Sequence, residues 1–250
     1  LNTAIQGMLA DGGHAVTTSM EHNSCVRPLD ALKSQGCADY TIVGASPEGA
    51  LNPDDVKKAI RPDTRLVAVN HGSNVFGTVQ PVREIGLVCR ERGVPFLVDA
   101  AQTAGIIPID MNADCIDLLA LAGHKALYGP TGTGALVLND HFDHSRLRPL
   151  RYGGTGSNSS SIEQPSFLPD RFESGTLNAA GISGLSAGID YLVSLKGGVE
   201  GVCAHKRTLV DRFVEGAGAL TSFVIPVAAY HIRTGVVSFN LAGISPSEVA

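Results

Sequence analysis

Three short, unbroken apolar runs constrain the fold of this chain more than any other feature. Each run is bounded by polar or glycine residues, and they cover residues 66–70, 95–99 and 118–122. Runs that are apolar throughout are typical of strands buried on both faces of a sheet. Helical patterns lie between them: residues 53–60 begin with proline and two acids, and residues 82–92 are amphipathic and end before Gly93. This β-α-β alternation predicts an α/β fold with a mainly parallel sheet flanked by helices.

Weaker patterns extend this architecture toward both ends of the chain. Further strands are predicted at residues 14–19, 41–43, 135–138 and 236–241, and helices at residues 1–10, 179–195 and 205–215. The pattern changes near Arg151, where a glycine- and serine-rich stretch predicts a flexible loop over residues 153–161. We therefore expect a large domain over residues 1–200 and the beginning of a smaller α+β domain over residues 201–250.

Both ends of the sequence favour a piece of a longer protein over a frayed natural terminus. The first residue is Leu1, and residues 1–10 have helical spacing without a preceding cap. Residues 245–248 form a capping box with Pro246 at the first helical position, and the sequence stops two residues later. The expectation of a longer protein rests on this helix start at residues 245–248, which has almost no sequence after it.

Composition excludes several classes of protein. Hydrophobic residues make up 44% and charged residues 17%, which is not typical of a disordered chain. No apolar stretch reaches the about 20 residues of a membrane span, and the net charge of −5 lacks the basic excess of a nucleic-acid binder. The five cysteines are scattered without a CxxC pair, so we expect a reducing cytoplasm rather than a disulfide framework or zinc ribbon. No metal site is expected, because His141 and His144 lie in a polar turn and are predicted to be solvated.

Polar side chains follow the predicted strands at the points where the strands end. They are Glu21, His22, Asn23, His71, Ser73, Asn74, Asp99, Gln102, His124 and Lys125. Ligands of open α/β sheets bind beyond the carboxyl ends of the strands. The sequence therefore predicts that these side chains converge on one crevice.

Lys125 stands out in this set because it lies at a strand exit beside a glycine-rich turn. A lone lysine is usually a solvated surface charge, but a lysine that loses solvation at such a junction can act as an amine nucleophile toward an aldehyde. Pyridoxal phosphate is the common biological aldehyde held in this way, and it needs a carboxylate at its pyridine nitrogen. Asp99, at the end of a buried run, suits that role; its alternative is a helix-capping aspartate at a strand end.

The motifs around these two residues resemble one family in particular. The stretches Asp-Ala-Ala-Gln-Thr-Ala-Gly at residues 99–105 and Gly-His-Lys-Ala-Leu-Tyr-Gly-Pro at residues 123–130 resemble the cysteine desulfurase/selenocysteine lyase family. Residues 20–23, 73–78 and 171–178 match in the same order along nearly the whole chain. This resemblance implies a class V, fold-type I enzyme dependent on pyridoxal phosphate, whose large cofactor domain would correspond to the α/β part.

The resemblance also implies a role for each matched residue. Lys125 would carry the covalent link to the cofactor, His22 would stack on its pyridine ring and assist proton transfer, and Asp99 would pair with the pyridine nitrogen. The other implied cofactor contacts are Asn74 and Gln102 near the phenolic oxygen, His124 at the phosphate, and Gly175 and Thr176 at the phosphate of a neighbouring subunit. The last two contacts imply a homodimer.

Three departures from the family pattern matter for activity. Ala122 stands where the family often has a phosphate-binding hydroxyl residue, and the phosphate-binding Thr-Glu motif that normally precedes the first helix is absent. The catalytic cysteine and the arginine that holds the substrate carboxylate would lie beyond residue 250. None of the five cysteines matches that catalytic position, and Cys25, the nearest to the predicted site, is more typical of a core residue. We therefore expect that these 250 residues do not turn over cysteine by themselves.

The resemblance implies sulfur or selenium abstraction from L-cysteine or L-selenocysteine, giving alanine and a persulfide, with a sulfur-acceptor protein as a further partner. Two other functions stay open. Another class V reaction, such as aminotransferase, lyase or epimerase chemistry, would use the same ring-binding residues without a persulfide cysteine. A non-catalytic scaffold with this fold is the third alternative, and the intact set of His22, Asp99 and Lys125 argues against it.

Overall fold

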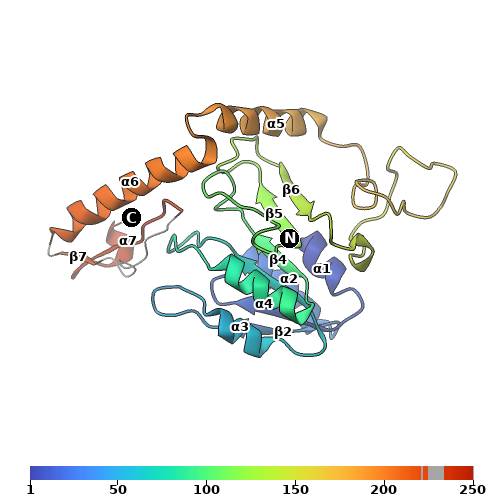
Figure 1. Ribbon diagram of the computed structural model, residues 1–250, viewed down its shortest axis with the longest axis horizontal. Helices are drawn as coiled ribbons and strands as arrows, with labels where there is room; N and C mark the ends of the chain where they lie inside the picture. Colours follow the sequence, from blue (N-terminus) through green and yellow to red (C-terminus); the bar gives the residue numbers. More distant parts are fainter. Residues whose placement is uncertain (221, 225–233, 250) are drawn as a thin grey trace.

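A six-stranded sheet forms the centre of the molecule in the computed structural model, which describes residues 1–220, 222–224 and 234–249 (Figure 1). Its strands are β1 (His14–Thr18), β2 (Asp39–Val43), β3 (Thr64–Asn70), β4 (Phe96–Asp99), β5 (Leu118–Ala122) and β6 (Gly134–Leu138). Their spatial order is β2-β1-β3-β4-β5-β6. The first five strands are parallel, and β6 pairs with β5 in the antiparallel direction. The predicted α/β class with a mainly parallel sheet is confirmed.

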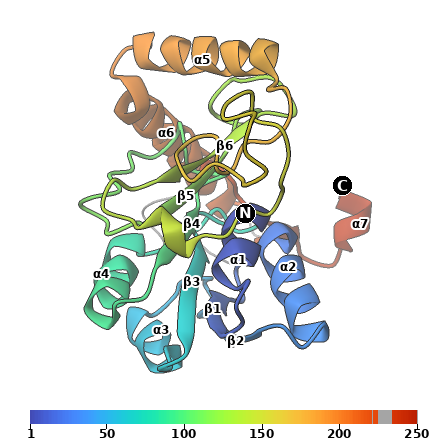
Figure 2. The ribbon, with the colours of Figure 1, turned by 90° about the vertical axis from the view of Figure 1, so that its right-hand side faces the viewer.

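Helices cover both faces of this sheet, as Figure 2 shows. Helices α1 (Asn2–Met8) and α2 (Asn23–Ser34) pack on one face, and α3 (Pro53–Ala59) and α4 (Val82–Arg92) pack on the other. Successive side chains of a strand point to opposite faces. In β3, Leu66 and Ala68 therefore belong to the core cluster under α1 and α2, whereas Val67 and Val69 belong to the cluster under α3 and α4.

The two core clusters, one on each face of the sheet, explain why the central strands are apolar throughout in the sequence. Phe96, Leu97 and Val98 are each fully buried in β4, although they face alternate sides. Complete burial of one such side chain contributes roughly 1.5–3 kcal/mol. A polar residue at any of these positions would therefore face a core on one side or the other.

Local signals fix the ends of the flanking helices. The Asn52 side chain accepts a hydrogen bond from the backbone N–H of Asp54 at 3.0 Å, and Pro53 occupies the first turn of α3. Helix α4 ends at Gly93, whose φ of 66° is left-handed and suits glycine.

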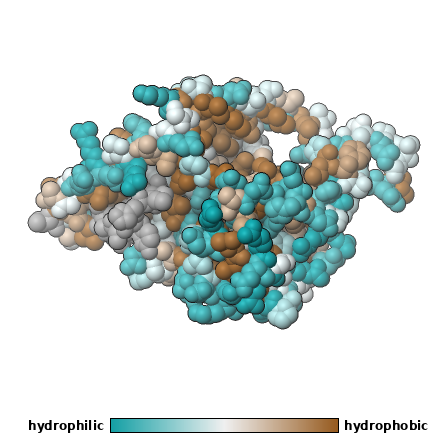
Figure 3. Space-filling view, viewed as in Figure 1, coloured by the Kyte–Doolittle hydropathy of each residue, from teal (hydrophilic) through white to brown (hydrophobic). Residues whose placement is uncertain are grey.

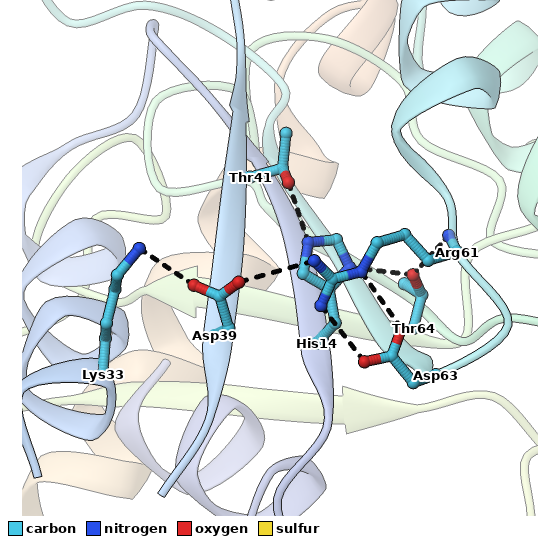
Figure 4. A network of polar contacts seen from close by, with 7 residues as sticks. All are labelled: His14, Lys33, Asp39, Thr41, Arg61, Asp63 and Thr64. Atoms are coloured by element: carbon cyan, nitrogen blue, oxygen red, sulfur yellow. Dashed lines mark hydrogen bonds and ion pairs between the residues drawn. The ribbon is translucent and has the colours of Figure 1, made fainter. Parts of the chain in front are cut away.

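A network of polar side chains ties β1, β2 and β3 together at their amino ends (Figure 4). The buried His14 ring lies 2.9 Å from both Thr41 Oγ1 and Thr64 Oγ1. Asp39 forms ion pairs with Lys33 at 2.9 Å and with Arg61 at 3.4 Å, and Arg61 also reaches Asp63. These ion pairs are exposed, so each contributes about 0–1 kcal/mol to stability. The link between the three strands therefore depends mainly on the hydrogen bonds of the buried His14 ring with Thr41 and Thr64.

The C-terminal third of the chain has a different construction. After the short 3-10 turn η1 (His144–Arg146), residues 151–178 contain no helix or strand. The long helices α5 (Ala179–Ser194) and α6 (Gly198–Gly218) follow. A two-stranded antiparallel pair of β7 (Phe223–Val224) and β8 (Asn240–Leu241) lies beyond them with the short helix α7 (Pro246–Val249).

One sequence-based prediction in this region needs correction, one is confirmed with longer bounds, and one stays a prediction. The strand predicted at residues 236–241 exists only as β8, because the preceding residues pack against the turn at residues 75–77, where Ser238 Oγ bonds Val75 O. The helix predicted at residues 205–215 is the middle of α6. The predicted domain division stays a prediction, and residues 200 and 201 lie within this same continuous helix.

No helix in the described ranges combines the length and apolarity needed to cross a bilayer. No group of three or more potential metal ligands gathers there either. His141 and His144 have separate partners, since His141 Nε2 lies 3.1 Å from Asp117 Oδ1 and His144 Nε2 lies 3.2 Å from Ser166 O.

Candidate active site

A cavity of about 930 Å³ opens at the carboxyl ends of β3, β4 and β5, where the sequence predicts a crevice. Six of the predicted site residues line it: His22, Asn74, Asp99, Gln102, His124 and Lys125. Small residues form much of the remaining wall near the strand ends, among them Gly72, Ala101, Ala120 and Ala122. The cavity is therefore wide enough for a small organic molecule and offers an amine, a carboxylate, imidazoles and amides.

Asp99 is the last residue of β4 and lines the cavity with 7% of its surface exposed. Its position is set by the register of the sheet, in which Asn70 and Asp99 are paired at the ends of β3 and β4. Asp99 Oδ1 accepts a hydrogen bond from the backbone N–H of Ala101 at 2.9 Å. Among the described residues, only Oδ1 of this carboxylate accepts a hydrogen bond. Oδ2 is therefore available to bind a cationic ring nitrogen.

Lys125 follows β5 within a tight turn whose backbone is strongly constrained. Gly129 donates to the Gly123 carbonyl at 2.8 Å, which closes the turn around the lysine. A Cβ atom on Gly129 would lie 2.7 Å from Leu185 Cδ1 of α5, so glycine permits the turn to pack against that helix. The lysine side chain itself is exposed and lines the cavity.

His22 occupies the N-cap of α2 and turns one ring nitrogen toward its own helix. Its Nδ1 accepts from the backbone N–H of Ser24 at 3.2 Å and lies 2.8 Å from Ser24 Oγ. Because Nδ1 acts as the acceptor, the neutral ring carries its proton on Nε2; this tautomer is assigned from the hydrogen-bond network. The cap holds the exposed imidazole at the wall of the cavity.

The amides Asn74 and Gln102 come from two segments that contact each other. Asn74 lies in the turn after β3, where Ser73 Oγ accepts from the backbone N–H groups of Val75 at 3.2 Å and Phe76 at 3.0 Å. Gly72, at the start of that turn, lies against the segment of Gln102, since an added Cβ would stand 2.7 Å from Thr103 Cγ2. Close backbone approach therefore brings the two amides to one wall.

Gly175 and Thr176 are not among the residues that line the cavity, and both are exposed. Gly175 has a left-handed φ of 90° and donates to the Gly154 carbonyl at 2.7 Å. The preceding residues of the same segment, Phe172 and Glu173, do line the cavity. The segment therefore borders the site through Phe172 and Glu173, whereas Gly175 bonds the backbone of Gly154 instead.

Asn70 lines the cavity and is bonded to Glu21, a half-buried residue with a buried carboxyl oxygen. The sequence analysis placed Glu21 among the residues of the crevice, but it gave neither residue a role. Glu21 Oε1 accepts from Thr18 Oγ1 at 2.7 Å and from the backbone N–H of Asn70 at 2.9 Å. Burial raises the pKa of the Glu21 carboxyl to about 8, and the negative charge of Asp99 adds to the rise. The sequence signal was position alone, because both residues stand at strand ends.

Two other buried titratable residues lie close by. Burial lowers the pKa of His71 to about 4, so its imidazole is neutral. Cys25 is 1% exposed and lies 3.7 Å from Thr17 Oγ1. Burial raises the pKa of the Cys25 thiol, which disfavours the thiolate that a nucleophile needs.

Comparison with known proteins agrees with this geometry. The profile of the family described as "Aminotransferase class-V" matches residues 1–250, and the chain belongs to that family. The chain is 35% identical to a probable cysteine desulfurase of Pyrococcus abyssi over 250 residues, covering 98% of this chain and 61% of that protein.

Solved structures give the same result. The apo structure of a cysteine desulfurase from Thermococcus onnurineus NA1 superposes with a TM-score of 0.87 at 33% identity, covering 100% of this chain and 62% of that one. A structure described as SspA in complex with cysteine gives a TM-score of 0.75 at 29% identity, covering 96% of this chain and 62% of that one. The chain thus spans about three fifths of the length of the relatives it matches. The predicted resemblance to the class V family is confirmed.

Proposed function

We propose that this protein is a pyridoxal phosphate-dependent cysteine desulfurase, which removes sulfur from L-cysteine and leaves alanine. The observation that carries the proposal is the cavity in which Lys125, Asp99 and His22 meet. The names of the relatives support the choice of reaction, and the structure of SspA in complex with cysteine supports a small amino acid as substrate. Cysteine and selenocysteine remain alternative substrates, because they differ only in the chalcogen.

The donor set fits the proposed cofactor. An amine that can bond an aldehyde, a buried carboxylate and an imidazole surround one cavity, which is the combination that pyridoxal phosphate requires. When bound, the cofactor supplies an electron sink that weakens bonds at the substrate α-carbon. Ala122 brings no hydroxyl to the wall, so the phosphate would rely on His124 and on backbone groups.

The protein residues would divide the work as follows. Lys125 would bind the cofactor through its amine and could move a proton at the substrate. Asp99 would hold the pyridine nitrogen in its charged form, and His22 would stack on the ring. Asn74 and Gln102 would donate to oxygen atoms of the cofactor.

Sulfur removal breaks the carbon–sulfur bond of cysteine and forms a sulfur–sulfur bond on a second thiolate, while the β-carbon takes a proton. That thiolate would belong to a cysteine outside these 250 residues, as would the arginine that binds the substrate carboxylate. The burial of Cys25 supports this division, since the thiol is kept protonated. A sulfur-acceptor protein would then take the persulfide sulfur.

We also propose a homodimer in which Gly175 and Thr176 reach the phosphate of the neighbouring subunit. Neither residue lines the cavity of its own chain, which supports a role elsewhere. Exposed apolar side chains on α5 support an interface, and Figure 3 shows hydrophobic side chains along the upper surface over this helix. Those most exposed are Ile182, Ile189, Tyr191 and Val193. The five free cysteines support a reducing compartment, and we propose the cytoplasm.

Borohydride trapping of the cofactor tests the site directly. The protein loaded with pyridoxal phosphate and then reduced should carry one stable adduct, on Lys125, in peptide mass spectrometry. Lys125→Ala should abolish it, while Lys33→Ala should retain it, because Lys33 pairs with Asp39 far from the cavity. An adduct on another lysine would contradict the assignment.

Product analysis tests the reaction. The full-length protein, supplied with L-cysteine and a thiol reductant, should release sulfide and alanine in equal amounts. Exchange of amino groups with a keto acid in place of sulfide would indicate another class V reaction. Failure to bind the cofactor at all would indicate a scaffold.

A further inference from the structure

Two buried oxygen atoms beside the cavity have no hydrogen-bond partner in the described structure. They are Glu21 Oε2 and Asn70 Oδ1. The same two residues are joined by the bond from the Asn70 backbone N–H to Glu21 Oε1 at 2.9 Å, and Asn70 Nδ2 donates to the Met20 carbonyl at 2.8 Å. A buried acceptor without a donor costs about 1–3 kcal/mol, so two of them on one bonded pair need a physical account.

A single proton supplies that account. If Glu21 carries a hydrogen on Oε2, this oxygen becomes a hydrogen-bond donor. Asn70 Oδ1 is an acceptor without a partner, and the backbone of Asn70 already bonds the same carboxyl group. Glu21 Oε1 keeps its bonds from Thr18 Oγ1 and from Asn70 in that state. Protonation therefore removes no existing contact and turns one of the two orphaned acceptors into a donor.

The charges around Glu21 favour the same state. The negative charge of Asp99 on β4 raises the pKa of this carboxyl, whereas the side-chain interaction with the Cys25 thiol on α2 lowers it. Two carboxylates that share one buried site disfavour double ionisation. Asp99 lines the cavity and Glu21 does not, so we assign the proton to Glu21.

We propose that Glu21 is a positioning residue that holds a proton and, as a neutral acid, fastens the end of β1 to the end of β3 beside the cofactor. This deepens the proposed function and rests on it. Its bonds with Thr18 and Asn70 fix the turn that delivers His22 to the cavity. The neutral acid also leaves Asp99 as the single carboxylate charge at the cofactor ring.

Stability measurements test the protonation state without the cofactor. A folded-state pKa above the unfolded value means that folding takes up a proton over the interval between the two, so the Glu21 contribution to stability falls as the pH rises through that interval. Glutamine mimics the neutral acid, because its amide oxygen accepts and its amide nitrogen donates. The ratio of unfolding constants, wild type over Glu21→Gln, should therefore rise by up to about tenfold per pH unit between pH 5 and 8 and level off above.

Glu84→Gln is the matched control, because Glu84 is exposed in the first turn of α4. Its ratio should stay constant over the same range. A constant ratio for Glu21→Gln as well would overturn the proposal. Infrared spectra give a second reading: the wild type should show the carbonyl stretch of a protonated carboxylic acid at pH 7, lost at alkaline pH and absent from Glu21→Gln. Absence of that band in the wild type would also overturn it.

The loaded protein tests the positioning role. The absorbance of bound pyridoxal phosphate should show an additional alkaline transition in the wild type that Glu21→Gln lacks, because ionised Glu21 places a second charge beside Asp99. Identical titrations in the two proteins would overturn this part. Failure of the cofactor to bind while the stability ratio still rises with pH would refute the proposed function and leave the protonated Glu21 intact.

Discussion

Gly105 lies where the motif at residues 99–105 meets the lysine turn, and its replacement by alanine gives a sharp test of that packing. Gly105 has a left-handed φ of 83°. A Cβ atom there would collide with the carbonyl oxygen of Ala126, would lie 2.9 Å from its carbonyl carbon, and would lie 3.2 Å from Leu192 Cδ2 of α5. Ala126 directly follows Lys125, so the clash is transmitted to the lysine turn.

The magnitude has two parts. The left-handed conformation costs an L-residue about 1–2 kcal/mol, and forcing an extra methyl group into a packed site costs about 1–3 kcal/mol. Gly105→Ala should therefore lower the free energy of unfolding by about 2–5 kcal/mol. Gly93→Ala isolates the first part, because Gly93 has a φ of 66° and nothing lies within 4 Å of its added Cβ; we expect about 1–2 kcal/mol for it.

Urea unfolding of both variants measures the difference. The unfolded-state entropy of the added methyl group is the same in both and cancels in the comparison. The cofactor readout should diverge too: Gly105→Ala should reduce the yield of the borohydride adduct on Lys125, whereas Gly93→Ala should not. Equal destabilisation by the two variants would refute the argument that close packing at Gly105 supports the lysine turn.

Three further predictions concern the cofactor site and the opposite end of the sheet. Asp99→Asn keeps the size of the side chain but loses its charge, so turnover in the full-length protein should fall by orders of magnitude with unchanged circular dichroism; wild-type turnover would make Asp99 purely structural. Ala122→Ser restores a hydroxyl to the cavity wall and should strengthen cofactor binding by about 0.5–1.5 kcal/mol in a fluorescence titration, unless the phosphate lies elsewhere. Burial, and then the Arg61 charge, lower the pKa of His14 from 6.5, so the unfolded state takes up a proton first as the pH falls. Stability should therefore be lost below about pH 6.5, and His14→Gln should weaken this loss in urea titrations at pH 5 and 7.

The sheet and most of the site could be predicted from the sequence because both depend on local patterns. A strand buried on both faces must be apolar throughout, so β3, β4 and β5 are visible as runs. Parallel strands end at one edge of the sheet, so polar residues that follow them are brought together there. Six of the ten residues predicted to converge line the cavity, whereas Glu21, Asn23, His71 and Ser73 do not. Asp99 and Lys125 follow neighbouring strands, and the structure brings both to one cavity.

Elements that depend on tertiary contacts could not be predicted in the same way. No helix was predicted over α2, which contains Pro28, a residue that disfavours helix interiors. Burial of Cys25 and Leu29 against the sheet outweighs that penalty. The alternating residues 236–239 suggest a strand, but the backbone of Thr234 bonds the Gly77 carbonyl at 3.0 Å and the segment packs on that turn instead.

Glu21 is an example of a site residue whose burial and protonation state could not be predicted from the sequence. The sequence places Glu21 beside His22 among the polar residues at strand ends, but nothing in the neighbouring residues indicates that its carboxyl is buried. Its environment arises because the end of β1 lies next to the end of β3, which places Asn70 over a residue 49 positions away in the chain. The protonation state of a buried carboxyl depends on such distant partners and on the charge of Asp99 across the sheet. Motifs therefore identify which groups would meet the cofactor, whereas the electrostatics that keep one of two neighbouring carboxyls neutral can be derived only from the fold.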